Sequence, residues 1–293
     1  MQAGALSPDP VTLIYHDVVE PGELDGSGFP GKLAGHYKLD RPLFVAHLEA
    51  IERALGRRSV ATAERPGSGQ VFLTFDDGGR SAYSPVADLL ESRGWRGHFF
   101  ITTACINQAG FLTGPQIREL RRRGHVIGSH SCHHPVQMAR YSREKLLAEW
   151  SESTAALADL LGEAVPIASV PGGYYSARVG EAAAAAGIGT LFTSEPCGRL
   201  AEAGGCTVLG RYAIFRQTPA AVAGGLVAGG SSYRYRQQLT WRAKKLLKRV
   251  AGRPYLLVRG WMLGNAEEAE VAELSRLVGE GRQGVDRSVD AAR

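Results

Sequence analysis

The segment that most constrains this chain is 71–79, VFLTFDDGG, a hydrophobic strand that ends in two adjacent carboxylates and two glycines. Successive side chains of a strand point to opposite faces, so Asp76 and Asp77 come close together only if the backbone turns there. Gly78 and Gly79 permit that turn. A bare Asp-Asp-Gly is commonly a solvated turn, so the pair indicates chemistry only together with a second element.

The second element is GSHSCHHP, in which His130 and His134 follow the hydrophobic run 125–129. One carboxylate and a histidine pair four residues apart form a metal-ligand set. A metal with three protein ligands keeps a position open for water, which is the catalytic arrangement. Cys132 lies between the two histidines, and we expect it to be a small packing residue rather than a fourth ligand, because the set is already complete.

TFDDG followed downstream by H-S-x-x-H-P resembles the first two motifs of the polysaccharide deacetylases, carbohydrate esterase family four. The resemblance runs roughly from residue 11 to residue 216. It implies that Asp76 is the general base and that one divalent cation binds to Asp77, His130 and His134. Zinc is the expected metal, with cobalt and nickel as alternatives.

VPGGYY, residues 170–175, stands where that family carries its third motif. On its own this loop is an ordinary Pro-Gly turn, and its position after a strand favours a functional role. Its glycines would bring backbone N–H groups close to a developing oxyanion, and a tyrosine would form an aromatic wall for a sugar ring. The expected substrate-binding residues are Pro171, Gly172, Gly173 and Tyr174, with Tyr175 as the other candidate for the wall.

The chain departs from the family pattern in two places. The third motif usually begins with an arginine that orients the catalytic carboxylate, whereas Ser169 and Val170 occupy that region here. Either another group holds Asp76 or nothing does. The family's closing strand usually ends in a histidine that acts as general acid, yet no histidine follows His134, and the segment 209–216, LGRYAIFR, lies about where that strand should be.

His16 ends the first hydrophobic segment, VTLIYHDV, and is our candidate for the missing general acid. A barrel closes on itself, so a first strand can take the place that a last strand fills in a differently ordered relative. A lone histidine at a strand end is also often structural, and that alternative stays open. We expect the remaining histidines to be structural or solvated: His36, His47, His98, His125 and His133.

Short buried strands alternate with amphipathic helices along the chain, which predicts an α/β architecture with a parallel sheet. The expected strands span 11–15, 71–75, 98–102, 167–170 and 190–193, and the expected helices span 41–55, 84–93, 142–161 and 176–186, with a further helix capped by Thr113. The resemblance narrows this to an incomplete, distorted (β/α) barrel of the polysaccharide deacetylase type. Catalytic side chains of such barrels lie at the C-terminal ends of the strands.

We expect residues 1–265 to form one catalytic domain and residues 266–293 to form a polar tail. The formal charge of +5 is local, because residues 233–254 carry five Arg and three Lys without an acid. Such a basic amphipathic segment suggests an anionic membrane surface, a lipid-linked sugar or a polyphosphate headgroup, with a solvated cap over the barrel edge as the alternative. Nucleic acid is the weaker third choice, because no binding motif accompanies the cations.

The sequence shows no apolar run of the roughly 20 residues that a membrane span requires. Its first residues, MQAGALSPDP, lack a basic region followed by an apolar core. We therefore expect a cytoplasmic protein or one peripheral to the membrane, unless a signal is missing from this sequence. The four cysteines show no CxxC spacing, which favours reduced thiols, with a Cys197–Cys206 disulfide as the alternative.

Together these features predict a metal-dependent hydrolase that cleaves linear amide C–N bonds by removing N-acetyl groups from an N-acetylhexosamine, free, in a glycan or lipid-linked. A carbohydrate-binding module that has lost catalysis is the first alternative, consistent with the missing arginine and histidine. A hydrolase of non-sugar amides or of acetyl esters is the second.

Overall fold

The computed structural model describes residues 10–62, 69–198, 201–230 and 232–241 of the 293 residues. These residues belong to one compact unit. The expected domain boundary at 265, the polar tail 266–293 and most of the basic segment 233–254 lie outside the described residues. The predictions for the domain boundary, the tail and most of the basic segment therefore stay untested.

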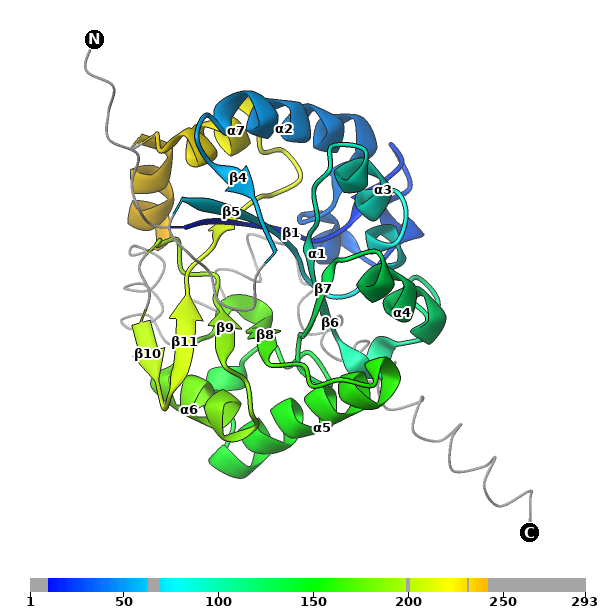
Figure 1. Ribbon diagram of the computed structural model, residues 1–293, viewed down its shortest axis with the longest axis vertical. Coiled ribbons are helices and arrows are strands. Elements are labelled where there is room, and N and C mark those ends of the chain that lie inside the picture. Colours follow the sequence, from blue (N-terminus) through cyan, green and yellow to red (C-terminus); the bar gives the residue numbers. More distant parts are fainter. Residues whose placement is uncertain (1–9, 63–68, 199–200, 231, 242–293) are drawn as a thin grey trace. The chain divides into compact units, whose positions relative to one another are not determined.

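The central element is a curled sheet whose strand order is β10-β11-β9-β8-β7-β6-β5-β1-β12, with β4 also paired to β5 (Figure 1). All of its strand pairs are parallel except β10 with β11. Its strands are β1 (Val11–Tyr15), β4 (Ser59–Val60), β5 (Gln70–Phe75), β6 (His98–Ile101), β7 (Val126–Ser129), β8 (Ile167–Ser169), β9 (Thr190–Phe192), β10 (Ala201–Ala203), β11 (Cys206–Leu209) and β12 (Tyr212–Ala213). Since the path ends at β10 and β12 without closing, the expected incomplete barrel is confirmed.

Helices cover the outside of this sheet (Figure 1). They are α1 (Lys32–Gly35), α2 (Arg41–Ala54), α3 (Val86–Glu91), α4 (Gly114–Arg122), α5 (Arg143–Leu161), α6 (Ala177–Ala185) and α7 (Ala220–Ala228), and residues 232–241 are also helical. Thr113 caps α4 in a full capping box with Gln116, as expected. A small separate sheet pairs β2 (Val18–Val19) with β3 (Leu39–Asp40).

Alternation along the strands divides the core into an outer and an inner layer. In β5, Val71, Leu73 and Phe75 belong to the large cluster that includes the side chains of α2 and α7. A smaller cluster contains only strand residues, one from each of five neighbouring strands: Phe100, Val126, Ile167, Phe192 and Leu209. Because no helix reaches that second cluster, it fills the inside of the curl.

The register of the parallel strands brings their C-terminal ends to one edge. Tyr15 lies opposite Phe75, Ile101 lies opposite Ser129, and Ser169 lies opposite Phe192. The residue after each strand therefore faces the residue after its neighbour, which places the side chains of the motifs side by side at this edge.

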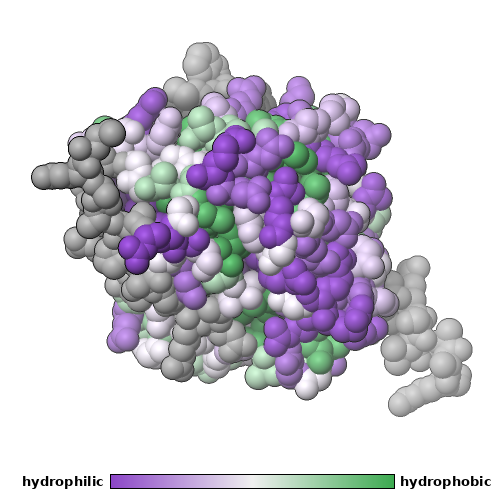
Figure 2. All heavy atoms as spheres, turned by 45° about the horizontal axis from the view of Figure 1, so that its top comes forward, coloured by the Kyte–Doolittle hydropathy of each residue, from purple (hydrophilic) through white to green (hydrophobic). Residues whose placement is uncertain are grey.

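The surface is mostly polar where the structure describes it. The face in Figure 2 is dominated by hydrophilic side chains, with hydrophobic ones in small areas between them. Among the described residues the exposed large hydrophobic side chains are Tyr235 and Leu239, at 63% and 55%. In the same part of the chain, every helix is too short or too polar to cross a bilayer.

Candidate active site

The two glycines of TFDDGG serve different purposes. The backbone turns at Asp77 and Gly78, with φ values of 75° and 82° in the left-handed region. Gly79 has an ordinary φ of −61°, but a Cβ there would lie 2.0 Å from Oδ1 of Asp17. Gly78 therefore makes the turn, whereas Gly79 allows a buried carboxylate to approach the backbone.

Asp17 connects the end of β1 to the turn after β5. The hydroxyls of Ser27 and Ser81 donate to its Oδ1 at 2.6 Å and 2.7 Å. Ser27 belongs to the long segment 20–39, which is held from inside by the buried Lys38 ammonium, a donor to three of its backbone carbonyls. A single buried network thus fixes this segment against the carboxylate turn.

The same segment contacts two of the expected site residues. The ring of Phe29 lies 5.1 Å from the ring of His134, and the ring of Tyr37 lies 4.8 Å from the ring of His16. The prediction that residues 20–39 form a rim over the site is consistent with these contacts.

The histidine loop also adopts unfavourable backbone conformations. Ser131 and His134 have φ values of 63° and 54°, and together with Asp77 they account for three of the four described non-glycine residues with positive φ. The Ser131 hydroxyl accepts a hydrogen bond from the backbone N–H of His134 at 3.1 Å, which stabilises the turn. Such strain costs about 1–3 kcal/mol at each residue and tends to occur at functional sites.

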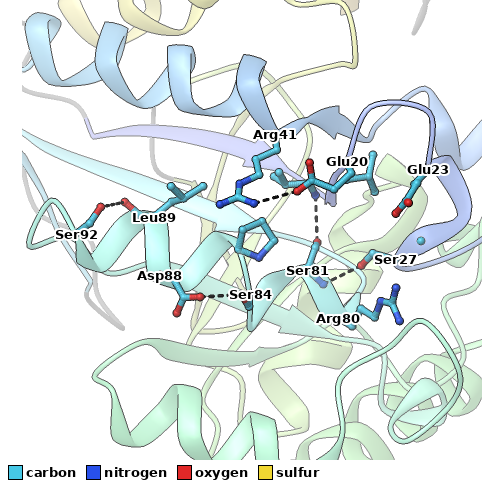
Figure 3. Close-up of a pocket in the computed structure, with 14 residues that line it drawn as sticks. Glu20, Glu23, Ser27, Arg41, Arg80, Ser81, Ser84, Asp88, Leu89 and Ser92 are labelled. Atoms are coloured by element: carbon cyan, nitrogen blue, oxygen red, sulfur yellow. Dashed lines mark hydrogen bonds and ion pairs between the residues drawn. The ribbon is translucent and has the colours of Figure 1, made fainter.

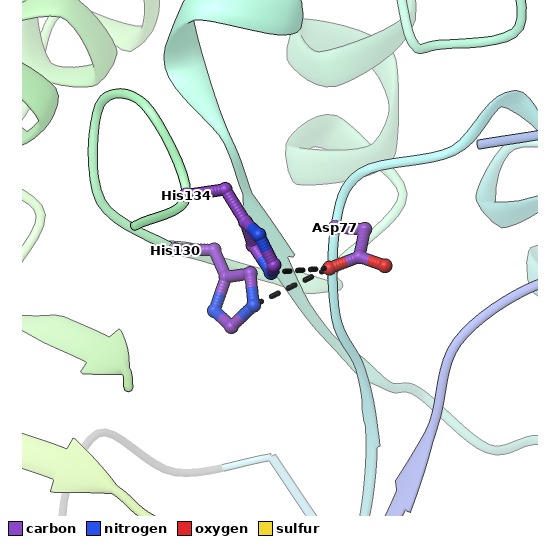
Figure 4. A group of neighbouring side chains, drawn as sticks. All are labelled: Asp77, His130 and His134. Carbon is purple, nitrogen blue, oxygen red and sulfur yellow. Dashed lines mark ion pairs between the residues drawn. The ribbon is translucent and has the colours of Figure 1, made fainter. Parts of the chain in front are cut away.

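Asp77, His130 and His134 converge on one point (Figure 4). Oδ1 of Asp77 lies 3.3 Å from Nε2 of His130 and 3.4 Å from Nε2 of His134. Metal–ligand distances of about 2.0–2.2 Å in a tetrahedral zinc site separate neighbouring ligand atoms by about 3.4 Å. The same Oδ1 is buried and makes no hydrogen bond to any residue that the structure describes. Both observations fit a divalent cation, so the expected ligand set is brought together.

Burial by itself raises the pKa of Asp77, but the facing imidazoles of His130 and His134 outweigh it and hold the pKa well below its usual value. Burial likewise lowers the pKa of His134, and the Asp77 carboxylate more than offsets this and raises it. The aspartate is therefore ionised, as a metal ligand must be.

Ser169 links the metal-ligand set to the expected base. Its hydroxyl donates to Oδ1 of Asp76 at 3.2 Å and lies 2.5 Å from Nδ1 of His130. With Nδ1 of His130 engaged by this serine, Nε2 faces Asp77 as a ligand atom. The serine that stands where the resemblance leads us to expect an arginine thus orients His130, one of the expected metal ligands.

Arg211, which the sequence analysis did not single out, holds the carboxylate of Asp76, the expected base. Its Nη1 donates to Oδ1 of Asp76 at 2.7 Å and its Nη2 donates to Oδ2 at 2.8 Å, a bidentate pair. The guanidinium is fully buried and also donates to the hydroxyl of Thr74 and to the carbonyl of Thr193. Of the two alternatives, the structure thus shows that another group holds Asp76. The available signal was an arginine directly after a hydrophobic strand.

The same arginine sets the charge of Asp76. Burial raises the pKa of this carboxyl, but the attraction of Arg211, followed by that of His130, outweighs burial and brings the pKa below its usual value. Asp76 is thus ionised and oriented, with Oδ2 3.9 Å from Nε2 of His130.

His16 lies at the same edge as the carboxylates. It follows β1, directly beside β5, and its electrostatic effect lowers the pKa of both Asp76 and Asp77. Its Nδ1 is buried and makes no hydrogen bond within the described part of the chain. An unsatisfied buried nitrogen is costly in a purely structural histidine, which favours a role at the site.

The third-motif loop lies beside the histidine loop. Pro171 is buried directly after β8, and both glycines have positive φ, 63° for Gly172 and 68° for Gly173. A Cβ on Gly172 would lie 2.4 Å from the carbonyl oxygen of Val136, so this glycine is required for packing between the two loops. The structure does not test the expected substrate contacts of this loop or of Tyr174.

The structure shows no disulfide among the four cysteines, so it gives no support to the alternative of a Cys197–Cys206 disulfide. Cys132 does not belong to the Asp77 set, as expected, but it lies in a second group with His133 and Glu152. His47, expected to be structural or solvated, is a fully buried structural histidine, with Nε2 2.7 Å from the carbonyl oxygen of Thr218.

A pocket of about 390 Å³ borders the network around Asp17, since Ser27 and Ser81 belong to its lining (Figure 3). It is lined by side chains of both charges, among them the ion pair between Arg41 and Glu20 at 3.1 Å. None of the metal-binding or catalytic candidates lines it, so it is not the expected active site.

Comparison with known proteins identifies relatives of the central region. The sequence model of the family described as polysaccharide deacetylase matches residues 63–191. The peptidoglycan-N-acetylmuramic acid deacetylase PdaA of Bacillus subtilis (strain 168) is 38% identical over 66 residues, which are 22% of this chain and 24% of that protein. Two further curated relatives are matched over 47% and 40% of their lengths, so the chain spans less than half of each of them.

Solved structures match more of the chain at lower identity. The deacetylase PplD of Streptococcus pyogenes, in complex with acetate, has a TM-score of 0.60 and 20% identity over 73% of this chain and 96% of its own. IcaB from Ammonifex degensii has a TM-score of 0.58 and 21% identity over 78% of this chain and 98% of its own. At these identities the likeness establishes the fold.

The buried pair between Asp76 and Arg211 predicts a pH-dependent loss of stability. In the metal-free protein at pH 7, Arg211→Met leaves a buried carboxylate unpaired, and we expect the free energy of unfolding to fall by about 3–5 kcal/mol. Burial then raises the pKa of Asp76, so the carboxyl takes up a proton on mild acidification. The deficit should therefore shrink at pH 4.5, as measured by urea denaturation.

Arg216→Met is the matched control, because Arg216 pairs with Asp40 in a partly exposed ion pair. This change should lower the free energy of unfolding by no more than about 1 kcal/mol at either pH. A deficit for Arg211→Met that is equally small, or the same at both pH values, would contradict the assignment.

Proposed function

Residues 63–191 belong to the polysaccharide deacetylase family, and on that premise we propose that the chain is a metal-dependent hydrolase that removes N-acetyl groups from an N-acetylhexosamine, free, in a glycan or lipid-linked. The observation that carries the proposal is an ionised, arginine-held Asp76 beside the convergent ligands Asp77, His130 and His134. The deacetylases among the relatives support the reaction class.

The three ligands would hold one divalent cation, with zinc as the expected metal. When bound, the cation supplies Lewis acidity toward the amide carbonyl oxygen and the attacking water. Asp76 would take the proton of that water. A carboxylate of low pKa is a weak base, so it accepts a proton only from an acidified donor, and its role depends on the neighbouring cation.

His16 would deliver the proton that the leaving amine needs. It approaches the two carboxylates from β1, and its unpaired Nδ1 and its ring contact with Tyr37 support a fixed orientation at the site. In this assignment Asp76 and His16 divide the proton transfers between two neighbouring strands, β5 and β1.

The third-motif loop would bind the substrate. Pro171, Gly172, Gly173 and Tyr174 follow β8 at the same edge of the sheet. A Cβ on Gly173 would lie 3.6 Å from the ring of Trp241, so an aromatic side chain borders the loop. We propose that Trp241 and Tyr174 together accommodate the apolar face of a sugar ring.

Arg211 favours the enzyme over a carbohydrate-binding module. The module was supported by the missing arginine of the third motif, and Arg211 provides a guanidinium at Asp76 from another part of the chain. Cleavage of non-sugar amides or of acetyl esters stays an alternative. Acetate release across N-acetylated sugars, glycans, simple amides and acetyl esters, with and without added metal, separates these classes.

Measurements of metal content and turnover test the proposed roles of Asp76 as base and His134 as metal ligand. We expect Asp76→Asn to keep its metal and to lose turnover by about two to four orders of magnitude, the usual contribution of a positioned base. His134→Ala should lose the stoichiometric metal in elemental analysis. Glu202→Gln, which changes an exposed side chain on β10, is the control and should keep both properties. Loss of metal in Asp76→Asn, or unchanged metal in His134→Ala, would show that the roles are misassigned.

The role of His16 can be tested by comparing two substrates. A departing amine is far more basic than the alkoxide of an activated ester, so it depends more on a proton donor. His16→Ala should therefore depress amide cleavage much more than cleavage of an activated acetyl ester, with unchanged metal content. Equal losses on both substrates would return His16 to a structural role.

We also propose that the basic segment brings the protein to an anionic membrane surface, which fits a cytoplasmic protein peripheral to the membrane acting on a lipid-linked sugar. Its described part, 232–241, is helical, and the exposed Tyr235 and Leu239 lie four residues apart on one helix face. An apolar pair beside exposed arginine favours attachment to anionic lipid over a fully solvated cap.

Liposome sedimentation tests this attachment. The protein should sediment with vesicles that contain acidic lipid at low salt, and less so at high salt, because screening weakens the attraction. Leu239→Glu should reduce sedimentation. A change at Leu55 would not serve as its control, because the Leu55 side chain packs on the core. Glu202→Gln, an exposed site on β10, is the control. Recovery in the supernatant under all conditions would leave the segment as a structural cap.

A further inference from the structure

A second cluster of metal-binding side chains lies beside the first. Cys132, His133 and Glu152 place a thiol sulfur, an imidazole nitrogen and a carboxylate oxygen within 4.8 Å of one another. We propose that this cysteine–histidine–glutamate cluster binds a second, softer divalent cation of the zinc class. The site is separate from Asp77, His130 and His134 and does not depend on the proposed function.

The spacing within the cluster suits zinc. Sγ of Cys132 lies 3.7 Å from Nε2 of His133. Tetrahedral ligands at a zinc–sulfur distance of about 2.3 Å and a zinc–nitrogen distance of about 2.0–2.1 Å are separated by about 3.6 Å. The thiol and the imidazole are thus already placed as two neighbouring ligands. A thiolate ligand selects zinc over magnesium or calcium.

Glu149 orients the imidazole of His133 in the manner typical of metal-binding histidines. Its Oε1 lies 2.9 Å from Nδ1 of His133, and its Oε2 accepts the backbone N–H groups of Cys132 and His133 at 3.1 Å and 2.9 Å. The carboxylate thereby engages Nδ1 and leaves Nε2 facing the thiol. Since Glu149 is nearly buried and fully engaged, it is the orienting group and not the ligand.

Glu152 supplies the third ligand from α5, one turn after Glu149. Its side chain is exposed, and no hydrogen bond or ion pair engages it within the described residues. The carboxylate is therefore available to a cation, and solvent can complete the coordination.

The position of the cluster predicts its effect. Cys132 and His133 lie between His130 and His134, in the loop whose backbone is strained at Ser131 and His134. A cation shared with Glu152 would tie this loop to α5 and hold the two histidine ligands of the first site. The protein should therefore melt at a higher temperature when the second cation is bound.

Cobalt titration of the metal-free full chain distinguishes the two sites. Thiolate ligation of Co²⁺ gives a near-ultraviolet charge-transfer band, which the first site, without sulfur, cannot produce. Wild type should bind two cations per chain and show the band, whereas Cys132→Ser and Glu152→Gln should bind one cation, with the band lost or strongly reduced. Glu149→Gln should lower the affinity for the second cation by about 10–100-fold.

Glu144→Gln is the matched control, an exposed glutamate on the same helix, and should keep both cations and the band. His134→Ala should keep the band while it loses the other cation, so failure of the first site and failure of the second are distinguishable. Absence of the band in wild type, or an undiminished band and affinity in Cys132→Ser or Glu152→Gln, would overturn the proposal.

Discussion

The buried ion pair of Asp76 and Arg211 is the interaction on which the site depends. Two buried charges are costly unless geometry and hydrogen bonding are excellent, and here both carboxylate oxygens are engaged by two guanidinium nitrogens. Arg211 lies between β11 and β12, where the sheet path is interrupted. The pair therefore links the end of β5 to the connection between β11 and β12, two strands that lie near opposite ends of the sheet path.

Around this pair, the C-terminal edge of the sheet concentrates backbone strain and buried polar groups. Asp77, Ser131 and His134 adopt left-handed conformations, and Asp17 is buried against Gly79. Compensating hydrogen bonds hold each of these features in place, since strained backbone persists only where its surroundings over-determine it. The expected ligands are therefore preorganised, because their side chains come from turns that tolerate little movement.

The departures from the family pattern show that the same functional group can reach the site from a different position in the sequence. The guanidinium expected in the third motif comes instead from Arg211, in the segment after β11. Ser169, which stands in the third-motif region, links Asp76 to His130. The fold is shared with the solved structures of PplD and IcaB at 20% and 21% identity. A barrel edge that collects residues from every strand permits such exchanges, because several chain positions reach the same point.

Local patterns were enough to predict β1, β5, β6, β8 and β9, the cap at Thr113 and the grouping of Asp77, His130 and His134, because hydrophobic periodicity and short motifs act over a few residues. The partner of Asp76 was not predictable in this way. Arg211 is 135 positions away in the sequence, and only strand order and curl bring the two together. The group around Cys132 and Glu152 likewise needed the packing of α5. The sequence determined which residue types could do chemistry, and tertiary structure decided which of them meet, since long-range contacts leave no local signature.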